Sequence, residues 1–190
     1  MTTRTFLLAA AVALLGAAPP AAKPADVAIV TTQGTIVVRI ETAKAPLTSA
    51  NFLRYVDGHR YDGASFYRTV RGVFGESVPR IQVVQGGLGQ APGKTFPPIP
   101  VEPTTRTGLH NVEGSLAMAR NAEPNSATSE FFVNVADDRW LDADRFDDHH
   151  GYAVFGRVVR GMDVVEKIHA APAQGDQLTP PIRIISVRRV

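Results

Sequence analysis

The sequence has no cysteine among its 190 residues. This absence excludes a disulfide framework, a thiolate zinc site, a cysteine nucleophile and a lipidated cysteine. Charge of one sign is also scarce, because 20 Lys and Arg stand against 18 Asp and Glu, which gives a net charge of +2. A balance this close does not predict a polyanionic partner, and we expect no nucleic acid to bind. Hydrophobic residues make up 44% of the chain and charged residues 20%, which is typical of one globular domain.

Long hydrophobic runs are absent except at the N-terminus. Residues 1–22 hold one positive charge, Arg4, then an apolar run over residues 6–18, then small residues and prolines. The run is too short to cross a bilayer comfortably and is apolar on every face, which favours a secretory signal peptide over a buried amphipathic helix. We expect cleavage near Ala22 and a domain over residues 23–190 that is periplasmic or secreted, with no membrane association after cleavage.

The sequence also lacks the motifs of several enzyme classes. No serine lies in a G-x-S-x-G elbow, the usual hydrolase signature. Gly93-Lys94-Thr95 is similar to the end of a phosphate-binding loop, but Leu88 stands where that motif requires glycine. Asp147-Asp148-His149-His150 could offer metal ligands, yet adjacent residues rarely converge on one ion, and a solvated loop is expected. We therefore expect neither a cofactor nor a metal.

Alternating apolar residues predict a fold rich in short strands. Residues 27–40 are typical of a hairpin with its turn at Gln33-Gly34. Helical spacing occurs instead over residues 46–58 and 162–170. The other predicted strands are residues 65–70, 81–85, 115–119, 131–135, 152–159 and 182–187. Eight strands and two helices predict an all-β fold, a closed eight-stranded antiparallel β-barrel capped by two α-helices. The Gly- and Pro-rich residues 86–103 are expected to form a long ordered loop.

Five short blocks follow one another along this pattern. They are Phe66-Tyr67-Arg68, Val83-Val84-Gln85-Gly86-Gly87, the stretch from Ser115 to Phe132, Trp140-Leu141-Asp142, and Tyr152-Ala153-Val154-Phe155-Gly156. Together they resemble the cyclophilin family of peptidyl-prolyl cis-trans isomerases, over residues 27–190 and in the order of the family. The short loops and the signal region are similar to the bacterial exported branch. The resemblance implies an isomerase that acts on proline-containing polypeptides among exported proteins, and we expect it to be a monomer.

The resemblance also assigns roles to site residues. Arg68 would donate a hydrogen bond to the substrate, and Gln85 would bind the substrate backbone and help to hold the arginine. Phe132, Leu141 and Val83 would form an apolar slot for the proline ring, with Phe132 and Phe131 on opposite faces of one strand. The other substrate-binding residues that it implies are Tyr67, Met118, Ala119, Arg120, Asn121, Glu130, Trp140 and Tyr152. Of these, Ala119 and the backbone of Arg120 or Asn121 would accept the extended peptide, and Trp140 and Tyr152 would lie at the rim.

Several positions depart from the family pattern. Gln82 stands where an aromatic residue usually walls the proline slot, and Phe74 could supply that wall instead. Glu130 replaces the usual glutamine, and because an ionised carboxylate cannot donate a hydrogen bond we expect it to pair with Arg68. Trp140 makes binding of cyclosporin-type inhibitors an expectation, although Gln82 and Tyr152 alter its surroundings.

Prolyl isomerisation fits a chain without a nucleophile or a metal. The barrier to rotation is about 18–20 kcal/mol, and a fixed donor can lower it by binding the twisted amide better than the planar one. Two alternatives remain open at this point. One is a non-catalytic proline-peptide binding module or holdase on the same fold, and the other is a structural envelope protein whose barrel serves as an interaction surface.

Overall fold

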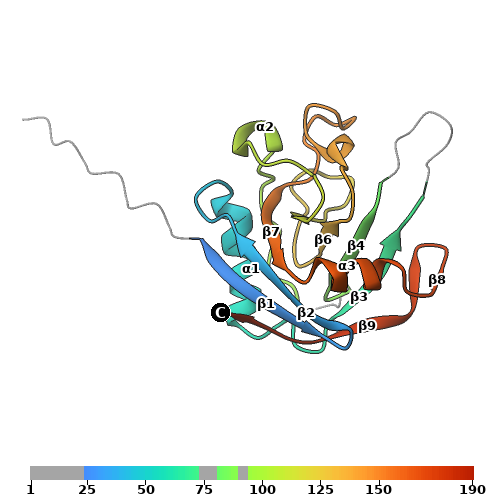
Figure 1. Ribbon diagram of the computed structural model, residues 1–190. Coiled ribbons are helices and arrows are strands. Elements are labelled where there is room, and N and C mark those ends of the chain that lie inside the picture. Colours follow the sequence, from blue (N-terminus) through green and yellow to red (C-terminus); the bar gives the residue numbers. More distant parts are fainter. Residues whose placement is uncertain (1–23, 73–80, 90–93) are drawn as a thin grey trace, which may run out of the picture.

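The structure is a computed structural model that describes residues 24–72, 81–89 and 94–190. The predicted signal peptide over residues 1–22 lies outside them. Strands dominate the described chain (Figure 1). The elements are β1 (Ala25–Thr31), β2 (Gly34–Ile40), α1 (Pro46–Asp57), β3 (Ser65–Val70), β4 (Val83–Gly87), α2 (Thr104–Thr107), β5 (Ser115–Met118), β6 (Phe131–Asn134), the 3-10 turn η1 (Arg139–Leu141), β7 (Val154–Arg160), α3 (Met162–His169), β8 (Ala173–Gln174) and β9 (Gln177–Arg189). In the part of the chain that is described, no helix combines the length and the apolar character needed to span a membrane.

Eight of the strands close into a barrel. Their order is β1-β2-β7-β5-β6-β4-β3-β9, and a further pairing of β1 with β9 joins the two ends of the sheet. The pairing that closes the sheet is antiparallel, like those between its other neighbours. Closure removes the open edges that invite aggregation. The predicted eight-stranded antiparallel barrel is therefore confirmed, with the two-residue β8 added as a hairpin on β9.

The helices differ from the prediction in number. The helices α1 and α3 are the two expected from their apolar spacing, and α2 is a third that the sequence did not suggest. It is a single turn of the polar sequence TTRT, so it has no apolar stripe from which a helix could be predicted. Pro103 precedes it, and Gly108 ends it with a φ of +67° that glycine adopts without strain.

The first hairpin shows how alternation sets the register. Ile29 of β1 pairs with Ile36 of β2, and both side chains are fully buried in the barrel. At the turn, Gly34 has a φ of +140°, and a Cβ there would lie 2.7 Å from Cγ2 of Val164 in α3. Glycine is therefore required twice, by the backbone of the turn and by the close approach of α3.

The barrel wall separates two apolar clusters. Phe131 of β6 points into the barrel, where its ring meets Phe52 of α1 edge-on with centroids 5.5 Å apart. The next residue, Phe132, belongs to a second cluster on the other face of the strand. That cluster contains Val70, Val83, Ala117, Phe132, Leu141 and Val154. Successive side chains of a strand point to opposite faces, and the prediction that Phe131 and Phe132 lie on opposite faces of one strand is confirmed.

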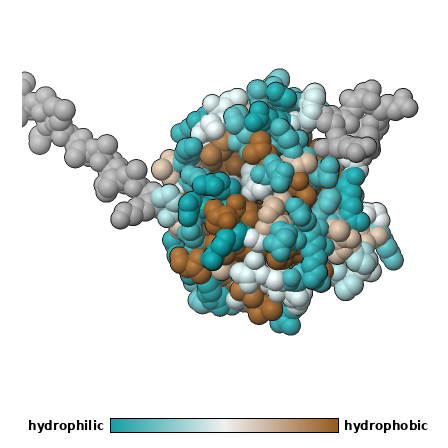
Figure 2. Space-filling model, viewed as in Figure 1, coloured by the Kyte–Doolittle hydropathy of each residue, from teal (hydrophilic) through white to brown (hydrophobic). Residues whose placement is uncertain are grey.

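The surface mixes residue types. Figure 2 shows one face of the molecule, on which hydrophobic residues form patches separated by hydrophilic ones. Among the described residues, the most exposed large hydrophobic side chains come from separate parts of the chain, namely Leu47, Trp140, Ile185 and Val190. Single exposed side chains of this kind are normal on protein surfaces.

The start of α1 is capped from a distant loop. Its N-cap residue, Ala45, makes no side-chain hydrogen bond to the helix. The carboxylate of Glu102, which is 3% exposed, accepts the backbone N–H of Leu47 at 3.1 Å and that of Thr48 at 2.7 Å. It also accepts the Thr48 hydroxyl at 2.7 Å. A negative charge is favourable at a helix N-terminus, so Glu102 fixes the loop to the helix.

We expect Glu102→Ala to lower the free energy of unfolding by about 2–3 kcal/mol, because buried helix N–H groups lose a charged acceptor. Glu102→Gln keeps one acceptor oxygen and should lose less. Glu113→Ala removes an exposed carboxylate and should change stability by no more than about 0.5 kcal/mol. Urea unfolding followed by circular dichroism measures all three, and equal losses in Glu102→Ala and Glu113→Ala would contradict the capping role.

A second buried carboxylate joins β4 to η1. Asp138 is fully buried, and its Oδ1 and Oδ2 accept the backbone N–H of Gln82 at 3.0 and 3.2 Å. Burial raises the pKa of Asp138 to about 7, an effect that the Gln82 N–H opposes and the neighbouring Asp137 charge adds to. Gln82 directly precedes β4 and Asp138 directly precedes η1, so this contact holds the two segments together.

The raised pKa predicts a pH-dependent contribution to stability. A carboxyl with a higher pKa in the folded state binds its proton more tightly there, so its stabilisation is full below about pH 4 and is lost as the pH rises to about 7. Asp138→Asn removes this loss. We expect the stability of Asp138→Asn relative to wild type to increase between pH 4.5 and 7.5 by about 1–4 kcal/mol, at about 1.4 kcal/mol per pKa unit.

Denaturant unfolding at several pH values gives this difference directly. Asp144→Asn, at an exposed position, is the matched control and should show a difference from wild type that does not change with pH. A flat difference for Asp138→Asn as well would mean that the folded protein does not hold the Asp138 proton.

Candidate active site

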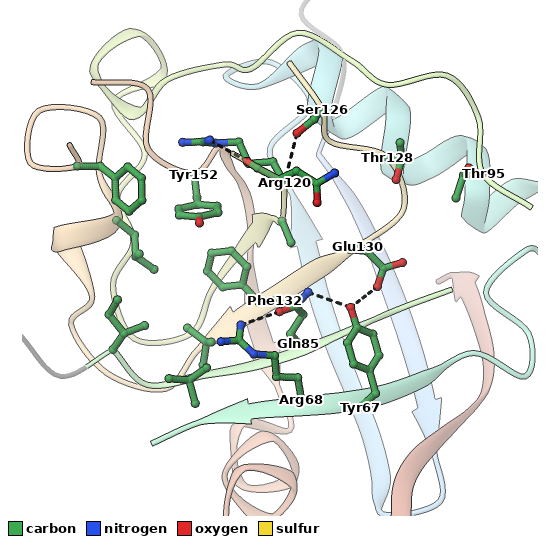
Figure 3. A pocket seen from close by; sticks show the side chains of 17 residues that line it. Tyr67, Arg68, Gln85, Thr95, Arg120, Ser126, Thr128, Glu130, Phe132 and Tyr152 are labelled. Atoms are coloured by element: carbon green, nitrogen blue, oxygen red, sulfur yellow. Dashed lines mark hydrogen bonds between the residues drawn. The ribbon is translucent and has the colours of Figure 1, made fainter. Parts of the chain in front are cut away.

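A cavity of about 630 Å³ opens on the outer face of the barrel wall, and Figure 3 shows the side chains around it. This volume is typical of a site for a small ligand or a short peptide segment. The lining residues are Tyr67, Arg68, Val70, Ile81, Val83, Gln85, Thr95, Ala119, Arg120, Asn121, Ser126, Thr128, Glu130, Phe132, Leu141, Phe146 and Tyr152. Most of the residues that the resemblance assigned to substrate binding are therefore brought together here.

One end of the cavity is an apolar slot. Phe132, Leu141 and Val83 line it, each 5% exposed, as the resemblance implied. The ring of Tyr152 packs edge-on against Phe132 with centroids 5.5 Å apart and against Phe146 at 5.3 Å. Such edge-to-face contacts stabilise the orientation of the rings that border the slot. Phe146 was not predicted, and no pattern around it distinguished it from other loop residues.

The wall near position 82 is aliphatic. Ile81 and Val83 line the cavity, whereas Gln82 between them does not, as alternation of side chains requires. Val70, at the end of the neighbouring β3, also lines it. Phe74, which could have supplied an aromatic wall, lies outside the described residues. Aliphatic side chains therefore stand where the resemblance implied an aromatic one.

A β-bulge in β3 turns two adjacent side chains into the same cavity. Phe66 pairs with Gly86 and Arg68 pairs with Gln85, so Tyr67 is an extra residue in the strand. In a regular strand Tyr67 and Arg68 would point to opposite faces, but both line the cavity. The bulge thus allows consecutive residues to contribute to one site. Alternation alone could not have predicted this, because a bulge interrupts the period of two.

The Arg68 guanidinium is held by two acceptors. Its Nη1 donates to Oε1 of Gln85 at 3.1 Å, and its Nη2 donates to Oδ2 of Asp176 at 2.9 Å. Since a guanidinium has five N–H donors and these contacts use two, three remain for a ligand. The predicted contact of Gln85 with Arg68 is confirmed. Asp176 was not predicted, because it lies between β8 and β9, 108 residues along the chain.

The hydrogen bonds continue from Gln85 to a carboxylate. Nε2 of Gln85 donates to Oη of Tyr67 at 2.9 Å, and that hydroxyl donates to Oε2 of Glu130 at 2.6 Å. Figure 3 shows the resulting chain from Arg68 to Glu130. The predicted pairing of Glu130 with Arg68 is therefore wrong, because Gln85 and Tyr67 lie between the two charges. Glu130 instead fixes the donor direction of the whole chain.

Tyr67 stays protonated in this arrangement. Burial raises the pKa of its phenol well above the ordinary value, and the hydrogen bond to the Glu130 carboxylate, with its negative charge, raises it further. The protonated hydroxyl therefore donates to Glu130 and accepts from Gln85. The amide of Gln85 is oriented in turn, with its oxygen toward Arg68.

Arg120 closes the cavity on the side opposite Arg68. Its side chain, 3% exposed, forms an ion pair with Asp148 and donates from Nε to the carbonyl oxygen of Gly151 at 2.8 Å. The guanidinium also lies over the Tyr152 ring, 5.0 Å from the centroid. Arg120 thus holds the loop that carries Tyr152. Asp148, from the acidic and histidine-rich run, serves this ion pair.

Two backbone amides near the predicted peptide-binding edge are already engaged. The N–H of Ala119 donates to the carbonyl oxygen of Glu130 at 2.9 Å, and the N–H of Asn121 donates to Oγ of Ser126 at 2.9 Å. Ala119 and Asn121 line the cavity as expected, but these contacts hold their amides within the protein. Ser126, Thr128 and Thr95 also line the cavity, and no substrate-binding role was predicted for them.

Two residues assigned to the site lie elsewhere. Met118 is 1% exposed and packs in the barrel interior, because alternation along β5 turns it away from the face that carries Ala117. Trp140 is 48% exposed and lines a separate depression with Asp137, Arg139 and Arg145. It belongs to the same 3-10 turn as Leu141, and consecutive residues of a turn point in different directions, so Leu141 enters the slot and Trp140 does not.

Known proteins resemble this chain along most of its length. Residues 26–189 match the family described as cyclophilin type peptidyl-prolyl cis-trans isomerase/CLD. A peptidyl-prolyl cis-trans isomerase of Acinetobacter baylyi is 39% identical over 163 residues, which cover 83% of this chain and 81% of the relative. Peptidyl-prolyl cis-trans isomerase A of Dickeya dadantii is 41% identical over 145 residues, 75% of this chain and 70% of that relative.

Solved structures show the same fold. The crystal structure of a cyclophilin type peptidyl-prolyl cis-trans isomerase of Cryptosporidium parvum matches with a TM-score of 0.69 at 20% sequence identity, covering 88% of this chain and 98% of that one. A structure of that protein in the presence of the dipeptide Ala-Pro matches with a TM-score of 0.67 at 20% identity, over 87% and 98% of the two chains. From its sequence matches and its closed barrel, the chain belongs to the cyclophilin-type peptidyl-prolyl cis-trans isomerase family.

Proposed function

We propose that Arg68 carries the isomerase activity of this cyclophilin by donating a hydrogen bond to the nitrogen of a twisted Xaa-Pro amide. The single observation that carries the proposal is the position of the Arg68 guanidinium, fixed by two acceptors on the wall of a cavity with an apolar slot. A proline ring in that slot would lie beside a donor whose direction is set before the substrate arrives.

The chemistry needs no group that is covalently changed. Rotation about the Xaa-Pro bond removes amide resonance, which is the origin of a barrier of about 18–20 kcal/mol. In the twisted amide the proline nitrogen becomes pyramidal and gains a lone pair that the planar amide lacks. A donor aimed at this lone pair stabilises the transition state more than the ground state, and only such a difference accelerates the reaction.

Arginine suits this task in two ways. The guanidinium stays charged at any working pH, and its planar fork can be held by some N–H groups while others donate. Gln85, on the cavity wall, and Asp176, in the turn between β8 and β9, hold one N–H group each. The remaining donors are therefore positioned without further loss of side-chain entropy when the substrate binds.

The shape of the cavity supports a peptide as the substrate. Phe132, Leu141 and Val83 offer a notch with little polar surface, and the polar end continues past it along Asn121 and Thr128. A related structure was determined in the presence of the dipeptide Ala-Pro, on the same fold. We propose that this protein binds proline-containing segments, with the proline in the apolar slot and the neighbouring residues in the polar end.

We expect Arg68→Ala to lower kcat/KM for cis-trans exchange of an Ala-Pro peptide by about 30- to 1000-fold, which is about 2–4 kcal/mol for loss of a transition-state donor. Arg68→Lys keeps the charge but loses the planar fork of N–H donors, so its kcat/KM should lie between those of wild type and Arg68→Ala. The exchange rate is measured by a protease-coupled assay.

The matched control is Arg39→Ala. Arg39 has a similar exposure, 39% against 34%, and also pairs with an aspartate, Asp26, but it lies outside the cavity. We expect its kcat/KM to equal that of wild type. If Arg68→Ala is folded by circular dichroism and isomerises the peptide as fast as wild type, Arg68 is not the donor. If the wild type binds the peptide but does not accelerate its cis-trans exchange, the protein is a peptide-binding module and not an isomerase.

We further propose that the substrates are exported proteins and that the mature protein is periplasmic or secreted. The support is the apolar run over residues 6–18 after Arg4, with small residues and prolines behind it. Expression of the full chain in a bacterial host should yield a mature N-terminus near residue 23 outside the cytoplasm, read by Edman sequencing of the fractionated protein. Deletion of residues 2–22 should keep the protein in the cytoplasm. An uncleaved chain in the cytoplasm would refute export.

A further inference from the structure

The charges around the cavity do not cancel. Two arginines line it, and each is paired with a carboxylate, Arg68 with Asp176 and Arg120 with Asp148. Their charges are therefore largely compensated within the protein. Glu130 also lines the cavity, and among the described residues no cation lies within ion-pair distance of it. The described lining thus presents one carboxylate without a cationic partner.

Glu130 is held firmly but by neutral groups. The residue is 5% exposed, its Oε2 accepts the Tyr67 hydroxyl at 2.6 Å, and its Oε1 accepts the Ser129 hydroxyl at 2.9 Å. The carboxylate also lies against Gly87, where a Cβ would come within 2.5 Å of Oε2. Buried carboxylates are usually paired with a cation, and each carboxylate oxygen can accept a second hydrogen bond. The side chain is therefore fixed, with acceptor capacity left over.

The surroundings of Glu130 are polar and roomy enough for another side chain. Thr95, Asn121, Ser126 and Thr128 line the same cavity as Glu130. In Figure 3, Thr95 and Thr128 lie on the side of Glu130, away from Phe132 and Tyr152, so the cavity has one apolar and one polar part. A flexible side chain with a charged tip fits such a part, because hydroxyl and amide groups can complete its hydrogen bonds.

The distance between Glu130 and Phe132 determines how far from its proline a bound peptide would carry the side chain that reaches Glu130. Glu130 and Phe132 are two residues apart and both line the cavity. In extended chain this corresponds to about 6.6–6.8 Å, and side chains two residues apart share one face. An extended peptide bound alongside, with its proline against Phe132, would therefore place the side chain two positions away beside Glu130.

We propose that Glu130 makes this cavity selective for a lysine or arginine side chain two residues from the substrate proline. The inference rests on the proposed function, since it uses the proline slot as its reference point. The cation of the substrate would pair with the carboxylate, while its aliphatic stem crosses between the slot and the polar end. Glu130 is thus a specificity-determining residue, distinct from Arg68, which acts on the amide itself.

The test compares peptides that differ in one charge. Exchange NMR gives kcat/KM for cis-trans exchange in acetyl-Lys-Ala-Pro-Ala-amide and in the norleucine analogue, which has the same stem without the ammonium group. A second pair, acetyl-Ala-Pro-Ala-Lys-amide and its norleucine analogue, places the residue on the other side of the proline. In at least one pair we expect the lysine peptide to be preferred by about 5- to 20-fold at low salt, and the preference to shrink as salt screens the pair.

Variants then assign the preference to its residue. In Glu130→Gln, which keeps an acceptor for Tyr67, we expect the lysine-to-norleucine ratio to fall to within about twofold of one, whatever the absolute rate. Glu123→Gln removes an exposed carboxylate that is not in the lining, and the wild-type ratio should persist. This control separates a local ion pair from a change of net charge.

Failure of this inference is distinct from failure of the isomerase mechanism. If the wild type accelerates lysine and norleucine peptides equally in both pairs, the selectivity is refuted while isomerisation stands. A preference that survives in Glu130→Gln would also refute the role of Glu130. If no peptide exchanges faster than without protein, the proposed function itself fails.

Discussion

The site depends on one chain of hydrogen bonds that links side chains on the outer face of the barrel wall. It begins at Asp176, passes through Arg68, Gln85 and Tyr67, and ends at Glu130. Arg68 donates to both Asp176 and Gln85, and from Gln85 onward each group donates to the next, because Tyr67 keeps its proton and Glu130 can only accept while it is ionised. The direction of every amide and hydroxyl in the chain follows from this. A donor fixed in this way can act on a twisted amide without first being ordered, which is where electrostatic catalysis obtains its advantage.

The backbone supplies the geometry that the chain of hydrogen bonds requires. The bulge at Tyr67 lets two consecutive residues face the cavity, one to carry the donor and the other to relay to the carboxylate. Regular alternation along β6 turns Phe131 and Phe132 to opposite faces, so that Phe131 packs inside the barrel while Phe132 forms part of the slot. Core and site are thus built from neighbouring residues of the same strands, which makes the closed barrel a rigid support for the cavity.

Much of this architecture could be predicted from the sequence, and the reasons for the exceptions are physical. Alternation and helical spacing identified the eight strands of the barrel, α1 and α3, because their apolar residues recur with the period of a strand or of a helix. The resemblance placed Arg68, Gln85, Phe132 and Leu141 in one site, and the structure brings them together. Asp176 could not be foreseen, since the β8–β9 turn reaches Arg68 only through tertiary folding. Met118 was misplaced because the resemblance was followed where alternation along β5 turns its side chain into the barrel. Trp140 was misplaced because its direction depends on the 3-10 turn, and Glu130 was paired with the wrong group because the relay through Tyr67 exists only in three dimensions.

The central claim is that a proline nitrogen comes within reach of the Arg68 guanidinium when the ring occupies the apolar slot. A crystal structure of the protein with a bound Ala-Pro peptide tests this most directly. We predict the proline ring against Phe132, Leu141 and Val83, with a guanidinium nitrogen of Arg68 within about 3.5 Å of the proline nitrogen or its amide. A peptide bound with its proline outside this slot, or an Arg68 side chain turned away from a proline inside it, would contradict the account.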